Sequence, residues 1–159
     1  MGDQPYQQPY QQPMQPPSQS AGAKWGPTSM GMEAHIAAGV SYLTPVAGLI
    51  FFLMEKNNRF VKFHAMQSMI LGVLYIVVFV ALLIVDTIIG TAASAVDSTG
   101  TLALVTGCLS ICVFGLVPLA FLGLWIWGLI AGFTGKYVKF PIIGNIAESW
   151  AGGPATPAY

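Results

Sequence analysis

Charged side chains are scarce in this 159-residue chain: they make up 8% of the residues, whereas 55% are apolar. A soluble globular domain carries about 25% charged residues, because water must solvate its surface. The composition therefore argues against a water-soluble fold and predicts an all-α membrane protein. The six basic and six acidic residues cancel, so the chain lacks the net positive charge that is typical of nucleic-acid binding.

Cysteine is almost absent, with only Cys108 and Cys112. Their spacing places them on one face of a helix, but no histidine or carboxylate lies near enough in sequence to complete a metal site. We interpret them as small packing residues. The sequence also shows no nucleophile with an acid/base partner. It therefore predicts a protein that is not an enzyme, with no catalytic, metal or cofactor-binding residue and no small-molecule substrate.

Large aliphatic residues are missing from the first 31 residues, which begin with the repeat QPYQ-QPYQ-QPMQ at positions 4–15. Such a segment cannot bury a core, so residues 1–31 are predicted to be a disordered tail. The alternative is that the tail, with its regularly spaced proline and tyrosine residues, is a ligand for an aromatic-lined groove. No basic segment precedes the first apolar run, so the pattern of a cleavable signal peptide is not seen.

Two long uncharged runs flank a short basic loop. The runs cover 36–54 and 65–85, which is 19 and 21 residues, and each is long enough to cross a bilayer core of about 30 Å. The loop between them contains Lys56, Arg59 and Lys62. Short basic loops are retained in the cytoplasm, so this hairpin is predicted to face it.

The first predicted membrane helix, 33–54, contains Pro45 near its middle, which predicts a kink. The alternative is a hinge or a re-entrant element. The second helix, 60–89, carries His64 and Gln67 on one face, and we favour a hydrogen-bonded structural pair over a pair that handles protons.

A third uncharged run spans 98–135, which is 38 residues, too long for one straight crossing and barely enough for two. We favour a single helix, 102–133, kinked at Pro118, because one crossing keeps the later lysines on the side of the basic loop. Gly128 and Gly132 form a GxxxG pair that suits packing within the chain or dimerisation.

A short interfacial amphipathic helix is predicted at 141–150, followed by a flexible end at 151–159. The whole domain, 32–150, is thus expected to cross the membrane three times. The amino terminus would lie outside the cell and the carboxyl terminus in the cytoplasm. An even number of crossings, from a re-entrant first helix or a split third run, is the main alternative.

Two blocks of sequence carry a resemblance to a known family: LTPVAGLIFFLMEKNNRFVKFHAMQS, which ends at Ser68, and GKYVKFPIIGNIAESW, which ends at Trp150. They resemble an uncharacterised family of small bacterial and archaeal multi-pass membrane proteins. That family is distantly similar to the Tic component of the chloroplast import translocon. The resemblance implies a location in the cell membrane of a prokaryote, but it implies no particular activity.

The leading functional hypothesis is a structural or interaction module. Its partners would be the lipid bilayer and either further copies of the chain, as a homo-oligomer, or other membrane proteins. The alternative is a translocation or channel-like module, which the similarity to the import translocon suggests. Against the alternative, no ionisable residue lies near the middle of a predicted helix, where ion pathways usually place one.

Overall fold

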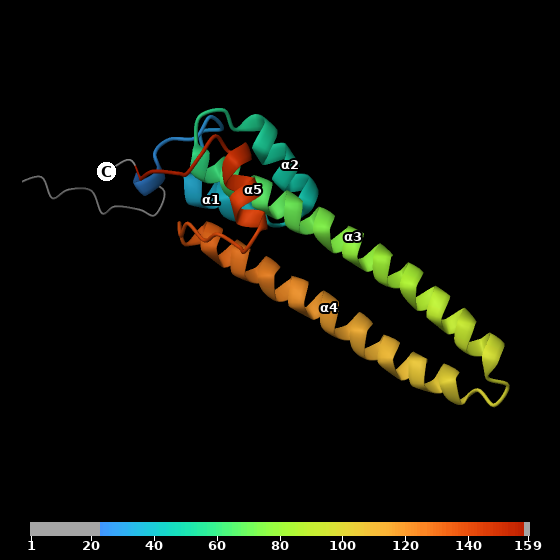
Figure 1. Ribbon diagram of the computed structural model, residues 1–159. Coiled ribbons are helices and arrows are strands. Elements are labelled where there is room, and N and C mark those ends of the chain that lie inside the picture. Colours follow the sequence, from blue (N-terminus) through green and yellow to red (C-terminus); the bar gives the residue numbers. More distant parts are fainter. Residues whose placement is uncertain (1–22, 158–159) are drawn as a thin grey trace, which may run out of the picture.

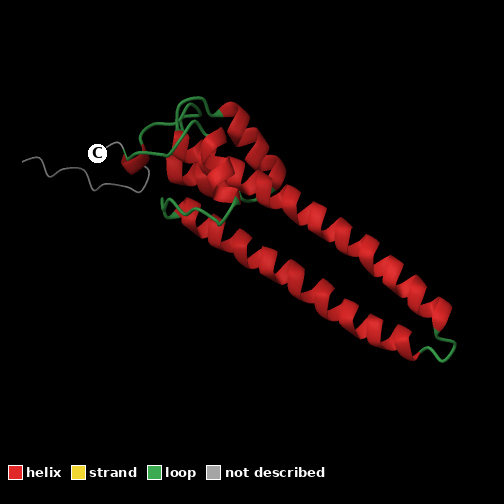
Figure 2. Ribbon diagram, viewed as in Figure 1, coloured by secondary structure: helices red, strands yellow, loops and turns green. Residues whose placement is uncertain are grey.

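The computed structural model describes residues 23–157, so the repeat that the sequence predicts to be disordered lies outside the described part. Within that part every regular element is helical (Figures 1 and 2). The elements are the short 3-10 helix η1 (Ala23–Trp25) and the α-helices α1 (Ala34–Val40), α2 (Pro45–Met54), α3 (Arg59–Val96), α4 (Thr101–Phe133) and α5 (Ile143–Trp150).

Helices α3 and α4 form a long antiparallel hairpin (Figure 1). They contain 38 and 33 residues, or about 57 and 50 Å at 1.5 Å per residue. Both are long and apolar enough to cross a membrane. The run 98–135 thus forms one helix with Pro118 inside it, as predicted, and not two.

The expected first crossing is wrong. Instead of one kinked helix, the chain forms α1 and α2, of 7 and 10 residues, which reach only about 11 and 15 Å. Pro45 begins a new helix, and the Thr44 side chain caps it by accepting a hydrogen bond from the Ala47 amide at 2.9 Å. This is the favoured role of proline at a first helical position. Two helices, not three, are therefore able to span a membrane among the described residues.

The short helices gather at one end of the hairpin (Figure 1). We call this assembly the cap: η1, α1, α2 and α5, with the segments that connect them and the ends of α3 and α4 that they cover. One close backbone contact joins α1 to α4. A methyl group on Gly132 would lie 2.7 Å from the backbone nitrogen of Gly39. The GxxxG pair therefore serves packing within the chain, since Gly128 likewise faces the Tyr42 ring.

Within the cap, helices α1 and α2 form a small helical hairpin. Its turn, 41–44, lies along α3 at the depth of Gly72, where Pro45 packs against that glycine. Its two outer ends meet, because the Ser29 amide before α1 donates a hydrogen bond to the Glu55 carboxylate after α2. The first apolar run thus turns back, as a re-entrant element would.

Charge divides between the two ends of the molecule. Every lysine and arginine of the chain lies in the cap or at its edge: Lys24, Lys56, Arg59, Lys62, Lys136 and Lys139. The opposite half of the hairpin carries two acids, Asp86 and Asp97. Asp86 accepts a hydrogen bond from Ser110 across the hairpin.

Helix α5 lies where an interfacial helix is predicted. Ile143 and Ala147 are buried against α3, whereas Ile142, Ile146 and Trp150 are exposed. Ile142 has a φ of 66°, and the Ile143 amide donates to the Pro141 carbonyl at 2.8 Å. This is a tight γ-turn that β-branched residues rarely adopt. The turn holds the exposed Ile142 side chain, 77% accessible, away from the cap.

Candidate functional site

The two sequence blocks that carry the family resemblance meet in the cap. The first block ends in the buried first half of α3, and the second runs from the end of α4 through α5. Polar side chains of α3 bond directly to the backbone of the segment 136–140. Because the two blocks are about 70 residues apart in sequence, this meeting point is the candidate functional site.

Gln67 joins three parts of the cap. Its side-chain nitrogen donates to the Tyr42 hydroxyl at 2.9 Å and to the Val138 carbonyl at 3.2 Å, and its oxygen accepts from the Phe140 amide at 3.3 Å. Tyr42 follows α1, and Phe140 precedes Pro141. The structural role predicted for Gln67 is thus supported by bonds to both regions. Burial strengthens such bonds because no water competes for them.

His64 is fully buried at the centre of an aromatic cluster. Its Nε2 atom lies 3.1 Å from the Lys136 carbonyl, so Nε2 carries the proton and donates. Nδ1 has no partner among the described residues. The rings of Tyr42, Phe60 and Phe63 meet the imidazole edge-on, with centroids 4.6–5.9 Å away. These aromatic surroundings suit a neutral histidine that packs against the rings and donates one hydrogen bond.

Glu55 and Asn58 fasten a segment that we call the N-terminal strap, residues 25–29. The buried Glu55 carboxylate accepts hydrogen bonds from the amide and hydroxyl of Ser29 and from the amides of Asn57 and Asn58. The Asn58 side-chain nitrogen faces three strap carbonyls, the nearest being that of Trp25 at 2.9 Å. Its oxygen accepts from the Val61 amide and caps α3.

Trp25 anchors the strap, although the sequence places it in the disordered tail. It is 8% exposed and stacks on Phe60 at 4.3 Å between ring centroids. Its indole nitrogen donates to the Gly135 carbonyl at 2.9 Å. The predicted tail boundary at residue 31 is therefore too late, since 25–29 belong to the cap. The sequence feature that could have indicated this burial is a tryptophan followed by Gly-Pro inside a polar segment.

The segment after α4 is held to α5 by Glu148. Its carboxylate accepts from the Tyr137 hydroxyl and from the Lys139 ammonium, each at 2.8 Å. The hydrogen bond from Lys139, which has the larger effect, and the one from Tyr137 hold the pKa of Glu148 below its ordinary value. Beyond α5, Ala155 packs against the Trp25 cluster, so the predicted flexible end also contributes to the cap, apart from 158–159, which are not described.

The two cysteines lie on α4, away from the cap. Cys108 and Cys112 are exposed, so they are not buried in the interior of the single chain, and their interpretation as packing residues stays a prediction. Among residues 23–157 no group of three histidine, cysteine or acidic side chains is placed to hold a metal ion. Within the described residues, the site joins segments that are distant in the sequence.

Replacing Glu55 with glutamine should destabilise the cap by about 2–3 kcal/mol at neutral pH, because an amide nitrogen would face donors. Burial raises the pKa of Glu55, but the bonds from Asn58, Asn57 and Ser29 outweigh it, so the pKa lies below the ordinary 4.5. The ionised form therefore stabilises the fold above pH 4.5, and this contribution is lost as the pH falls through the lowered pKa. Melting temperatures from pH 3 to 7 measure both effects.

The matched control for that experiment is Glu148→Gln, which removes a partly exposed carboxylate from the same end of the molecule. It should lower the melting temperature at pH 7 by less than Glu55→Gln does. Equal melting temperatures for wild type and Glu55→Gln at pH 7 would show that the strap is not held by this carboxylate.

Comparisons with known proteins agree with a membrane location. The model of the magnetosome magnetite crystal formation protein family matches residues 27–147. A UPF0132 membrane protein of Archaeoglobus fulgidus is 35% identical over 123 residues, which cover 77% of this chain and 99% of the relative. One of Methanocaldococcus jannaschii is 34% identical over 127 residues, covering 79% and 96%.

No solved structure matches the chain. The matches give no support to the expected similarity to the Tic component of the import translocon. The matched region begins in the strap and ends in α5, so it contains the hairpin and nearly all of the cap. The chain therefore belongs to the magnetosome magnetite crystal formation protein family, and its archaeal relatives are UPF0132 membrane proteins.

Proposed function

We propose that this chain is a non-enzymatic structural or interaction module of the membrane, which packs with further copies of itself or with other membrane proteins. One observation carries the proposal: the fold turns its polar side chains inward and its apolar helices outward. The polar side chains of the first block bond within the cap, as Glu55, Asn58 and Gln67 show. The most apolar stretch of α4 is entirely unburied.

The bilayer placement follows from exposure and charge. Large apolar side chains are exposed along the hairpin on both helices, for example Ile76, Ile88, Leu104 and Leu119, and a bilayer core of about 30 Å would cover them. All six basic residues lie at the cap end, and basic residues are retained in the cytoplasm. The cap is thus cytoplasmic, and the turn 97–100 lies on the opposite side.

This placement changes the orientation expected from the sequence. With two crossings, the strap and α5 lie at the same end of the hairpin (Figure 1), so both termini are cytoplasmic. With three crossings, Lys24 alone among the basic residues would lie outside. Two crossings remove that exception and follow the lysine and arginine bias more closely.

The surface that would contact another membrane protein is the exposed side of α4. At Gly107, Gly115 and Gly123, no atom lies within 4 Å of where a methyl group would stand. Small residues let membrane helices approach closely, and that approach drives association where the hydrophobic effect is absent. These three glycines are therefore free for a second molecule, whereas Gly128 and Gly132 are used within the chain.

The descriptions of the relatives determine how specific the proposed function can be. The family description concerns magnetite crystal formation, and the archaeal relatives are described only as membrane proteins. The membrane location comes from the descriptions of the archaeal relatives, and the proposal builds on it. No observation favours the translocation or channel-like alternative.

The exposed cysteines of α4 provide a test of self-association. Oxidising native membranes with copper phenanthroline should link copies through Cys108 or Cys112 if α4 helices pack together. Gly115→Leu should reduce the linked dimer severalfold, because the larger side chain would hold the helices apart. Gly90→Leu, at an open position of α3, is the matched control.

The yield of linked dimer decides between the two kinds of partner. Equal yields from wild type and Gly115→Leu would exclude self-association through the face of α4 that carries Gly115. In that case, crosslinking to other membrane proteins should identify a partner on this face. A monomer without crosslinks to any membrane protein would contradict the proposal.

A further inference from the structure

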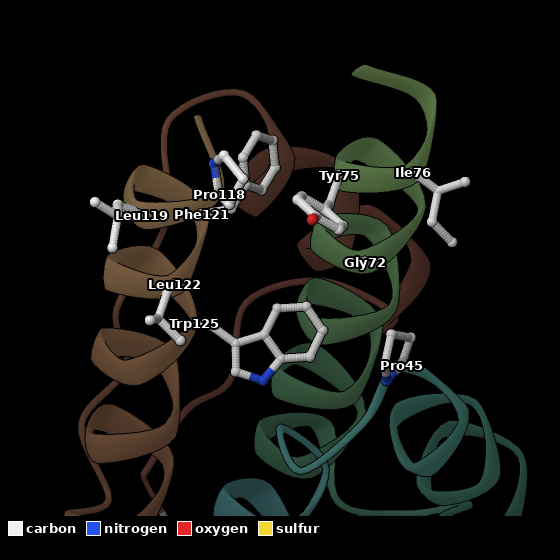
Figure 3. A pocket seen from close by; sticks show the side chains of 9 residues that line it. All are labelled: Pro45, Gly72, Tyr75, Ile76, Pro118, Leu119, Phe121, Leu122 and Trp125. Atoms are coloured by element: carbon white, nitrogen blue, oxygen red, sulfur yellow. The ribbon is translucent and has the colours of Figure 1, made fainter. Parts of the chain in front are cut away.

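A cavity of about 630 Å³ lies between α3 and α4 just below the cap (Figure 3). Helix α3 contributes Gly72, Tyr75 and Ile76 to its wall. The cap closes one end, where Pro45 packs on Gly72. The remaining wall comes from α4 and consists of Pro118, Leu119, Phe121, Leu122 and Trp125.

Aromatic rings form much of the wall. Tyr75 meets Phe121 edge-on, with ring centroids 5.3 Å apart. Trp125 is fixed at the cap end because its indole nitrogen donates to the Tyr42 carbonyl. These aromatic faces and edges favour a planar ring that packs against them, since ring pairs gain about 0.5–1.5 kcal/mol beyond the area they bury.

The Tyr75 hydroxyl is the polar group that the wall offers to an occupant. Figure 3 shows its oxygen on the side of α3 that faces α4. Among the described tyrosines, Tyr42 and Tyr137 have hydrogen-bond partners, whereas Tyr75 has none within residues 23–157. A hydroxyl without a partner is costly in hydrocarbon, where no water replaces the lost bond. An occupant with an acceptor would remove this cost.

The lining of the cavity restricts the occupant to an uncharged molecule. None of its nine lining residues is charged, so a charged headgroup would lose its hydration there without gaining a partner. Tyr75 lies 21 residues before the end of α3 at Val96, which is about 32 Å along the helix axis. In the bilayer placement proposed above, the cavity therefore lies in the hydrocarbon layer next to its cytoplasmic side.

We propose that this cavity binds an isoprenoid quinone of the membrane. The planar ring lies against Phe121 and Trp125, and a quinone carbonyl accepts a hydrogen bond from the Tyr75 hydroxyl. The isoprenoid chain leaves between Ile76 and Leu122, which are 58% and 53% exposed and border the lipid. The proposal concerns binding only and includes no electron transfer. It depends on the bilayer placement but not on self-association.

A photoreactive azidoquinone in nanodiscs of neutral phospholipid, with the purified full-length chain, provides the test. Peptides containing 72–76 and 118–125 should be labelled, and excess decylubiquinone should compete. Tyr75→Phe should weaken competition by about three- to tenfold, the usual effect of one hydrogen bond. Leu122→Trp fills the cavity and should nearly abolish labelling. Leu104→Trp, at a position of α4 that is 73% exposed and outside the cavity, should label like wild type.

Melting temperatures and membrane extraction of each variant show whether it is folded and inserted, so a failed insertion is told apart from a failed site. Two results would overturn the proposal. One is labelling of the cavity that decylubiquinone does not reduce, with equal labelling by a photoreactive phospholipid, which would mean that ordinary acyl chains fill it. The other is equal labelling of Leu122→Trp and wild type, which would place the quinone outside the cavity.

Discussion

Gly132→Val should destabilise the folded cap by about 3 kcal/mol or more, near the upper end of the cost of overpacking. A methyl group on Gly132 would lie 2.7 Å from the Gly39 nitrogen and 2.8 Å from the Ala38 carbonyl carbon. Both are backbone atoms, so no side-chain rotation relieves the clash, and α1 must move away from α4. Unfolding in mixed micelles with increasing dodecyl sulfate measures the free energy.

Gly123→Val is the matched control for Gly132→Val. Both glycines lie in α4, but no atom lies within 4 Å of a methyl group on Gly123. This variant should differ from wild type by less than about 1 kcal/mol, mainly through helix propensity. Similar losses for both variants would mean that α1 does not pack on α4 as the structure shows.

Trp25→Ala should cost about 3–5 kcal/mol, the range for removing a buried aromatic side chain. The substitution removes the stacking on Phe60 and leaves the Gly135 carbonyl without its donor. The strap should then detach while the hairpin stays inserted. Limited proteolysis should show new cleavage between residues 23 and 33, and the melting temperature should fall.

Trp150→Ala provides the comparison for Trp25→Ala, because Trp150 is 66% exposed on α5. It should leave the cleavage pattern of the strap unchanged. Protection of the strap in Trp25→Ala equal to that in wild type would contradict the assignment of residues 25–29 to the cap.

The long helices could be read from the sequence because their signal is strong and local. Uninterrupted apolar residues and the lysine and arginine bias identified α3 and α4, including the choice of one helix for 98–135. The break at Pro45 could not be settled in the same way. A proline in an apolar run either kinks one helix or begins another, and the Thr44 cap that decides this is seen only in the structure.

The candidate site was predicted in part. His64 and Gln67 were expected to form structural hydrogen bonds, and the structure shows those bonds. Their partners include the carbonyls of Lys136 and Val138, and backbone groups leave no trace in a sequence. The strap was missed because Trp25 lies in a polar segment without periodicity, and its burial depends on Phe60, 35 residues later.

The central claim is that the chain crosses the membrane twice, with the cap and both termini in the cytoplasm. Its most direct test is labelling of intact cells with a membrane-impermeant maleimide, after Cys108 and Cys112 are replaced by serine. Single cysteines are introduced as Ser98→Cys in the distal turn, as Ser149→Cys on α5 and in a tag at the amino terminus. Two crossings predict labelling of Ser98→Cys alone until the cells are permeabilised. Labelling of the amino-terminal tag in intact cells, with Ser149→Cys protected, would contradict the account and restore three crossings.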